Sequence, residues 1–126
     1  MPEVSIIIPL YNSNGYITET IDSILRQSYK DYEIIVVDDG STDGSSELLL
    51  SRYRDKVRYF KQPNSGISAA RNMAIRSSKG NYLAFIDHDD KWLPDKLEKE
   101  MGLFNRDAKL GLVRSEERRV GKECTI

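Results

Sequence analysis

Short apolar runs alternate with amphipathic segments along most of the chain. The run from Val4 to Asn12 is almost continuously apolar and ends in a polar turn, which predicts a strand buried on both faces. The segment that follows, residues 15–29, has the period of an amphipathic helix, because its apolar side chains recur three and four positions apart. Those side chains are Ile17, Ile21, Ile24 and Leu25.

The same alternation of strand and helix is repeated three more times. Further strands are predicted over residues 34–37, 57–62 and 81–87, and further helices over residues 45–53, 64–80 (a loop, then a helix) and 92–104. Gly80 suits the end of one of these helices, and Pro94 suits the first turn of the next. This order predicts an α/β fold with a mostly parallel sheet and flanking helices. A short apolar run over residues 110–113 indicates the start of a fifth strand.

Composition and charge narrow the class of protein. The 126 residues carry a formal net charge of -1, so no strong basic field indicates binding to nucleic acid. No apolar run approaches the roughly 20 residues that span a bilayer, and the N-terminus does not resemble a secretory signal. The single cysteine, Cys124, cannot form an internal disulfide. These features lead us to expect a cytoplasmic location.

The C-terminal segment, Arg114–Ile126, breaks the pattern. It is rich in charge and has no usable period. It resembles the peptide obtained by translating a common sequencing adapter, so we expect it to be non-native and exclude it from the reasoning on fold. The alternative is a genuine charged surface tail.

Three polar clusters follow predicted strands, where ligands of parallel α/β sheets bind. They are Tyr11–Asn12, residues 38–41 and residues 87–90. Tyr11 can either stack on a base or pack against the protein. The clusters are expected to meet at one edge of the sheet.

Three aspartates crowd around one histidine in the sequence FIDHDD, residues 85–90. At about 4 Å and an effective dielectric constant near 20, two such charges repel by roughly 4 kcal/mol before solvent screening. A hard cation such as Mg²⁺ offsets this repulsion, since it binds carboxylates together with substrate phosphates. Asp87 and Asp89 can point the same way from an extended segment, with Asp90 adjoining. Alternatively the acids cap the next helix, although one acid is enough for capping.

Two other residues near this cluster receive simpler interpretations. His88 lies between the acids, but hard-cation sites prefer oxygen ligands, so we expect a packed or solvent-facing histidine. Trp92 is expected to build the core beneath the acidic residues.

A second acidic cluster ends the second predicted strand. Asp38 and Asp39 can accept hydrogen bonds from a nucleotide base or ribose, or they can serve the turn, with Thr42 or Asp43 capping the next helix. Arg71 suits phosphate recognition, or it forms a surface ion pair. The glycine-rich dinucleotide motif is absent, which argues against a nicotinamide cofactor, and the P-loop motif that cradles phosphates is absent as well.

Taken in order, the segments VSIIIPLYN, VVDDGSTDGS, NSGISAARN and FIDHDD with WLPDKL resemble the inverting family 2 glycosyltransferases of GT-A fold. The resemblance covers about residues 3–113. It implies a Rossmann-like, mostly parallel sheet with flanking helices, truncated here after about four to five strands. Residues 1–113 are then expected to be the nucleotide-sugar-binding half of such a domain.

The resemblance also implies a donor and the residues that bind it. The donor is a nucleotide sugar, usually UDP-linked. Residues that match Pro9 and Tyr11 line the base pocket in the family, the residue that matches Asp39 binds the uracil edge, and the position of Arg71 faces the nucleotide.

The acidic motif has its own counterpart in the family. Asp87 and Asp89 correspond to the D-x-D element, with Asp90 adjoining, and these acids contact the ribose and hold Mn²⁺ or Mg²⁺ on the diphosphate. We favour Asp89 as the metal ligand and Asp87 as the residue that serves the ribose.

The implied reaction is inverting transfer of the sugar to a glycan or lipid-linked acceptor in cell-surface polysaccharide synthesis. It needs a general base, which in the family lies on a later segment, beyond the point where the match ends at Val113. No catalytic residue is therefore assigned in this chain, and nothing supports Asp95 as a substitute. The family's acceptor-binding half and any membrane-associated region also follow later, which would place the full-length protein at the inner face of the membrane.

Three alternatives stay open at this point. The chain could be a nucleotide-binding fragment without catalysis, because the base is missing. A nucleotidyltransferase shares the donor fold, but its glycine-rich basic loop near the first strand is not seen. The fragment could also fail to fold stably, since a truncated sheet leaves an unpaired edge.

Overall fold

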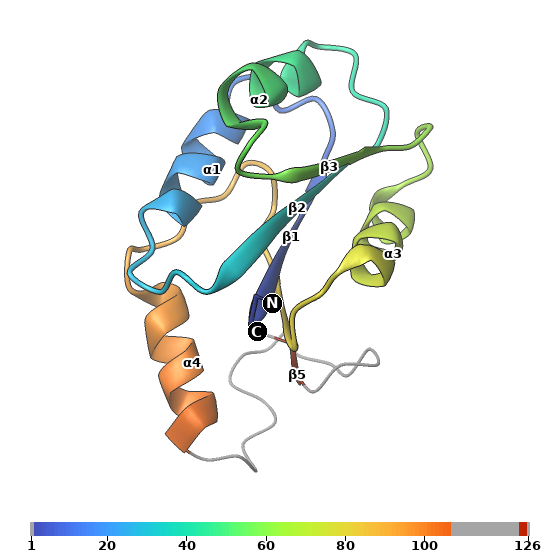
Figure 1. The fold of residues 1–126 in the computed structure, drawn as a ribbon. Coiled ribbons are helices and arrows are strands. Elements are labelled where there is room, and N and C mark those ends of the chain that lie inside the picture. The colour runs from blue at the N-terminus through green and yellow to red at the C-terminus, as the bar shows by residue number, and fades with distance from the viewer. Residues whose placement is uncertain (1, 107–123, 126) are drawn as a thin grey trace.

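The computed structural model describes residues 2–106 and 124–125 as a three-layer α/β fold (Figure 1). The strands are β1 (Val4–Leu10), β2 (Tyr32–Asp38), β3 (Arg58–Lys61), β4 (Tyr82–Phe85) and β5 (Cys124–Thr125). The helices are α1 (Ile17–Leu25), α2 (Ser45–Tyr53), α3 (Ile67–Ser77) and α4 (Lys96–Arg106). From β1 to α4 strands and helices alternate as predicted.

The sheet is parallel throughout and has the order β3-β2-β1-β4-β5. The chain moves outward from β1 to β2 and β3, and then crosses back to place β4 on the other side of β1. This reversal creates a topological switch point between β1 and β4, where α/β sheets bind ligands. The predicted mostly parallel α/β sheet is confirmed.

The C-terminal predictions fall mainly outside the described residues. The expected strand over residues 110–113 lies there, as do residues 114–123 and 126 of the segment interpreted as non-native. Cys124–Thr125 forms β5, which pairs with β4 in the register Tyr82 to Cys124. The origin of residues 114–126 stays a prediction.

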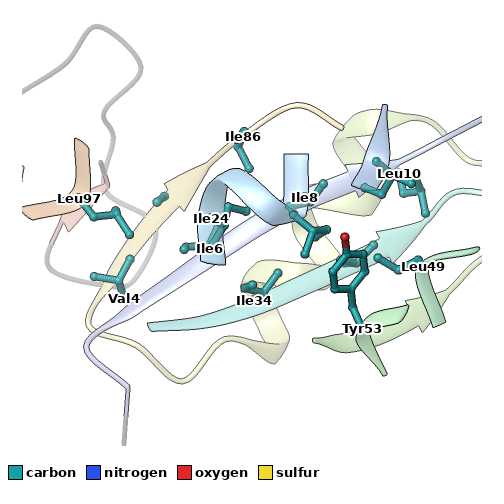
Figure 2. Packing of buried hydrophobic residues seen from close by; sticks show 14 of the residues in the cluster. Val4, Ile6, Ile8, Leu10, Ile24, Ile34, Leu49, Tyr53, Ile86 and Leu97 are labelled. Atoms are coloured by element: carbon teal, nitrogen blue, oxygen red, sulfur yellow. The ribbon is translucent and has the colours of Figure 1, made fainter. Parts of the chain in front are cut away.

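Both faces of the sheet are buried, as the apolar runs predicted. Along β1, Ile6 packs with α1, α2 and α4 on one face, whereas Ile7 packs with α3 on the other. Along β2, Ile34 and Ile35 divide in the same way. Figure 2 shows the larger cluster, with labels on Val4, Ile6, Ile8, Leu10, Ile24, Ile34, Leu49, Tyr53, Ile86 and Leu97. Each fully buried isoleucine contributes about 1.5–3 kcal/mol, so this core is the main stabilising element of the fold.

The role predicted for Gly80 is wrong. Helix α3 ends at Ser77, before this glycine is reached. An added Cβ on Gly80 would lie 2.7 Å from the backbone nitrogen of Ser5, which is far too close. The glycine is therefore needed for close packing of the α3–β4 connection against β1.

Helix α4 begins at Lys96, later than the sequence pattern predicted. The residues before it are held along α1 and the segment that follows α1 by hydrogen bonds. The Trp92 amide donates to the Ser23 hydroxyl at 3.2 Å, and the Pro94 carbonyl accepts from the Ser28 amide at 2.9 Å. Pro94 therefore lies outside the first turn of α4. In the part of the chain that the structure describes, no helix has the length and apolarity needed to cross a membrane.

Candidate functional site

The three polar clusters meet at the carboxyl edge of the sheet. Asp38 ends β2 opposite Leu10, the last residue of β1, and the Asp39 amide donates to the Leu10 carbonyl at 2.8 Å. A pocket of about 220 Å³, which we call the small pocket, opens at this edge. Its walls are formed by Pro9, Leu10, Tyr11, Asp39, Asn64, Ile67 and His88. The predicted base-pocket residues Pro9, Tyr11 and Asp39 thus lie together.

Asp39 is buried, with 6% of its surface exposed, and it holds the loop between β3 and α3. Its Oδ1 accepts hydrogen bonds from the Ser65 amide at 2.7 Å and the Gln62 side chain at 2.8 Å, and its Oδ2 accepts from the Gly66 amide at 3.0 Å. Burial raises the pKa of Asp39, but the three donors outweigh this effect and hold the pKa below its ordinary value. The carboxylate is therefore charged and oriented.

Two exposed apolar side chains line the same pocket. Tyr11 is 43% exposed and Ile67 is 50% exposed, and neither belongs to a core cluster. Exposed apolar surface beside a fixed carboxylate suits a flat ligand with a polar edge, such as a nucleotide base. The alternative that Tyr11 merely packs is therefore not favoured.

Side chains interlock the loop after β1 with the loop after β2. Asn12, whose φ of 47° is left-handed, accepts the Thr42 amide on its side-chain oxygen at 2.8 Å. Asp43 accepts the Asn14 amide at 3.0 Å and the amide of Ser45, the first residue of α2, also at 3.0 Å. The N-cap of α2 is Gly44, so neither Thr42 nor Asp43 occupies the predicted capping position, although Asp43, one residue earlier, accepts the first amide of the helix. The interlock fixes the two loops that carry the small pocket.

The acidic loop, residues 86–95, joins β4 to α4. The side chains of Asp87, Asp89 and Asp90 are exposed, and the Asp90 amide closes a turn onto the Asp87 carbonyl at 3.1 Å. Helix α4 begins only at Lys96, so none of these acids occupies its N-cap. The capping interpretation of the acidic cluster is therefore wrong.

The acidic loop offers hard oxygen donors, which are the ligands that Mg²⁺ and Mn²⁺ prefer. Among residues 2–106, 124 and 125, no three or more carboxylate, histidine or cysteine side chains converge into a preformed metal cluster. These donors fit an ion that is completed by substrate oxygens, since Mg²⁺ is usually bound by one or two carboxylates plus phosphates.

Arg71 lies beside the acidic loop. Its Nη2 is 3.8 Å from Oδ1 of Asp87, and its guanidinium carbon is 5.6 Å from the centre of the Phe85 ring. Its Nε is enclosed and has no hydrogen-bond partner within the described residues. The Arg71 guanidinium faces the site, where it can either pair with Asp87 or bind a phosphate. Both interpretations offered from the sequence thus apply to the same group.

A second pocket, of about 550 Å³, extends from Arg71 along the acidic loop to α4. Asp87 and Asp90 line it, together with Trp92 and Glu100. The predicted site residues are therefore divided between two pockets, and Asp89 is exposed without lining either of them. Trp92 packs against the larger core cluster, as predicted.

Sequence reasoning missed four residues of the small pocket, which are Leu10, Asn64, Ile67 and His88. His88 is half-buried and lines the pocket, and its Nδ1 is enclosed without a partner in the described part of the chain. Asn64 and Ile67 come from the segment NSGISAARN, which the sequence singled out for Arg71. The motif gave the right segment, but spacing alone does not show which of its side chains face the pocket.

The comparison with known families decides the class of this protein. The sequence profile described as Glycosyl transferase family 2 matches residues 5–120. The chain belongs to glycosyltransferase family 2. An uncharacterized glycosyltransferase of Rickettsia typhi is 47% identical over 105 residues, which are 83% of this chain and 33% of that protein. The putative teichuronic acid biosynthesis glycosyltransferase TuaG of Bacillus subtilis is 45% identical over 103 residues, which are 79% of this chain and 41% of that protein. The chain thus spans less than half the length of these relatives.

Solved structures confirm the predicted GT-A fold. TarS of S. aureus, residues 1–349 in complex with UDP-GlcNAc, superposes with a TM-score of 0.75 and 32% identity. The match covers 82% of this family 2 chain and 31% of the TarS chain. The mannosyltransferase PcManGT of Pyrobaculum calidifontis, in complex with GDP-Man and Mn²⁺, gives a TM-score of 0.66 at 31% identity, over 72% of this chain and 28% of that one.

Proposed function

We propose that this chain is the donor-binding part of a glycosyltransferase that uses a UDP-linked sugar and Mn²⁺ or Mg²⁺. The observation that carries the proposal is the meeting of Tyr11, Asp39 and the acidic loop at one edge of the sheet, at its switch point. The family of the chain supports it, and so do structural neighbours bound to UDP-GlcNAc or to GDP-Man and Mn²⁺.

In this proposal the small pocket receives the base. Pro9 and Tyr11 flank the ring, and Asp39 accepts a hydrogen bond from the uracil edge. Among the described residues, Oδ2 of Asp39 has one donor, the Gly66 amide, whereas Oδ1 has two. A carboxylate oxygen accepts about two hydrogen bonds, so Oδ2 retains capacity for a ring N–H.

The acidic loop and Arg71 receive the ribose and the diphosphate. Asp89 is the favoured metal ligand, Asp90 adjoins it, and Asp87 serves the ribose. A divalent ion bound there would neutralise charge that develops on the departing diphosphate. Arg71 lines the larger pocket and its Nη2 lies 3.8 Å from Asp87, so its guanidinium can donate to a phosphate oxygen beside the loop.

The complete reaction is proposed as inverting transfer to a glycan or lipid-linked acceptor in cell-surface polysaccharide synthesis. The relative named for teichuronic acid biosynthesis supports this class of acceptor. We assign no general base among the described residues. The proposed location is cytoplasmic, at the inner face of the membrane.

Calorimetric titration with UDP, in the presence and absence of Mn²⁺, tests the donor site. Asp87→Asn and Asp89→Asn should each weaken the metal-dependent binding of UDP about tenfold or more, because Asp89→Asn removes a charged ligand of the metal and Asp87→Asn removes a charged hydrogen-bond acceptor for the ribose. Asp55→Asn is the matched control, since Asp55 is an exposed acid between α2 and β3, at the opposite edge of the sheet.

Metal-dependent UDP binding that persists unchanged in both loop variants would overturn the assignment of the acidic loop. A parallel assay of UDP-sugar hydrolysis separates the remaining alternative, because binding without turnover is the behaviour of a non-catalytic nucleotide-binding module.

A further inference from the structure

One face of α1 carries buried polar side chains where an apolar face would be expected. Thr20, Ser23 and Gln27 recur three and four positions apart and thus lie on one side of α1 and the turn that follows it. Each is at most 1% exposed. We call these three residues the polar stripe. Burial of polar groups costs free energy unless they are hydrogen-bonded, so their partners decide their role.

The first partners are backbone carbonyls of the acidic loop. The Thr20 hydroxyl lies 2.6 Å from the carbonyl oxygen of Asp90 and 3.0 Å from that of His88, and it donates to this pair. Ser13, just before α1, donates its hydroxyl to the same His88 carbonyl at 2.9 Å. The carbonyls of His88 and Asp90, the two residues that flank Asp89, are thus anchored to α1 and to the residue just before it.

The rest of the stripe holds the path from the acidic loop into α4. Ser23 accepts the Trp92 amide at 3.2 Å. The side-chain amide of Gln27 donates to the Leu93 carbonyl at 2.6 Å, and its oxygen accepts the Leu97 amide at 3.0 Å. Residues 88–95 belong to no helix or strand, so side chains of α1 replace the partners that regular structure would provide.

We propose that the polar stripe is a template that sets the conformation of the acidic loop. Thr20 is then a positioning residue for the loop aspartates that would hold the metal on the diphosphate. This inference rests on the proposed function. Asp87, Asp89 and Asp90 repel one another when no cation is present, so a free loop would spread them apart. Anchoring the carbonyls of His88 and Asp90 holds Asp89 near the arrangement that a cation needs, as outer partners do in metal sites.

Thr20→Val tests the template, since it removes the hydroxyl and nearly preserves the shape of the side chain. We expect metal-dependent UDP affinity to fall about tenfold or more. Binding of the free base uracil without metal should change little, because Thr20 does not line the small pocket and Ser13 still holds the His88 carbonyl. Thr20→Ser retains the hydroxyl and should restore the metal-dependent affinity, which a general loss of stability would not reproduce.

Thr18→Val is the matched control, because Thr18 lies on the same helix and its side chain makes no bond to the acidic loop within the described residues. Amide hydrogen exchange gives a readout that needs no ligand. Exchange at Asp90 and Trp92 should accelerate in Thr20→Val and not in Thr18→Val. Ser13→Ala removes one of the two hydroxyl bonds to the His88 carbonyl and none to the Asp90 carbonyl, so it should show a smaller acceleration. It provides a second variant if Thr20→Val fails to fold.

The outcomes separate the two ideas. A failure of the wild-type protein to bind UDP in the presence of Mn²⁺ would overturn the proposed function, and with it the positioning role of Thr20. Wild-type binding together with unchanged affinity and unchanged exchange in Thr20→Val would overturn the template and leave the donor site standing.

Discussion

Asp39 and Gly40 show how two adjacent residues build one wall of the small pocket. Asp39 turns inward to hold the amides of Ser65 and Gly66, which requires the loop after β3 to approach the chain after β2 closely. Gly40 permits this approach. Its φ is +83°, and an added Cβ would lie 3.0 Å from the backbone nitrogen of Asn64, which lines the pocket.

Gly40→Ala should therefore destabilise the protein by about 1–3 kcal/mol, because alanine is strained at positive φ and the new methyl crowds backbone. Urea denaturation measures this change in the free energy of unfolding. Gly15→Ala is the control, since an added Cβ on Gly15 would meet no described residue within 4 Å apart from its chain neighbours, and its φ is not left-handed. Equal effects of the two substitutions would contradict this account of Gly40.

The sequence resemblance named Asp39 for the uracil edge, but it did not show that the residue also serves as a loop clamp. Spacing places Asp39 after a strand, while its partners Gln62 and Ser65 come from a loop more than twenty positions away. The two interpretations offered from sequence, turn residue and ligand acceptor, are therefore compatible in the structure.

At the scale of elements, Glu33 ties several strands together at the edge of the sheet opposite the site. Its Oε2 accepts the Ser5 hydroxyl at 2.6 Å and the Lys79 amide at 2.7 Å, and its Oε1 accepts Arg58 at 2.8 Å. These contacts join β1, β2, β3 and the segment before β4. Burial raises the pKa of Glu33, but the hydrogen bonds from Ser5, Lys79 and Arg58 lower it and outweigh burial. The pKa of Glu33 is therefore below its ordinary value.

The lowered pKa of Glu33 predicts acid-dependent stability. In the unfolded chain Glu33 has a pKa of about 4.3, so as the pH falls Glu33 is protonated in the unfolded chain before it is protonated in the folded one. The stabilisation from Glu33 is thus fully present above that pH and is lost as the pH falls through the lower folded pKa. Glu33→Gln should be less stable than wild type by about 1–3 kcal/mol at neutral pH, and the difference should shrink in acid.

Urea denaturation between neutral pH and pH 3 measures this difference. Glu98→Gln is the control, because Glu98 is exposed on α4. The free energy of unfolding of this variant should follow that of wild type at each pH. A difference between Glu33→Gln and wild type that does not change with pH would contradict the proposed charge-dependent network.

The helices also show where sequence patterns stop being informative. The apolar period gave the buried face of α1, and Ile17, Ile21 and Ile24 are fully buried. The same pattern placed the start of α4 at Trp92, four residues too early. Local preference was overridden there, because Ser23 and Gln27 of a distant segment hydrogen-bond the backbone that would have formed the first turn.

At the scale of the whole molecule, the two core clusters share one sheet. Adjacent residues of β1 and β2 belong to opposite clusters, so neither helical layer can separate without exposing the apolar face of the strands. Trp92, the single tryptophan, packs against the larger cluster from the acidic loop. The described fold is therefore expected to unfold as one unit.

Urea unfolding followed by circular dichroism and by Trp92 fluorescence should give superimposable, cooperative transitions. A gradual loss of signal would favour the alternative that the fragment does not fold stably. Two separated midpoints would show that the acidic loop detaches before the sheet unfolds, contrary to the shared core.

The sequence by itself determined the order of strands and helices, their buried faces and the family motifs, because these depend on local periodicity and residue type. It also placed acidic residues after the strands that carry them. Only the tertiary structure decided that β4 returns beside β1, that the predicted site residues are divided between two pockets, and that α1 holds the acidic loop. The physical reason is that these features depend on contacts between segments such as Thr20 and Asp90, which are distant in sequence, and no local pattern encodes such pairs.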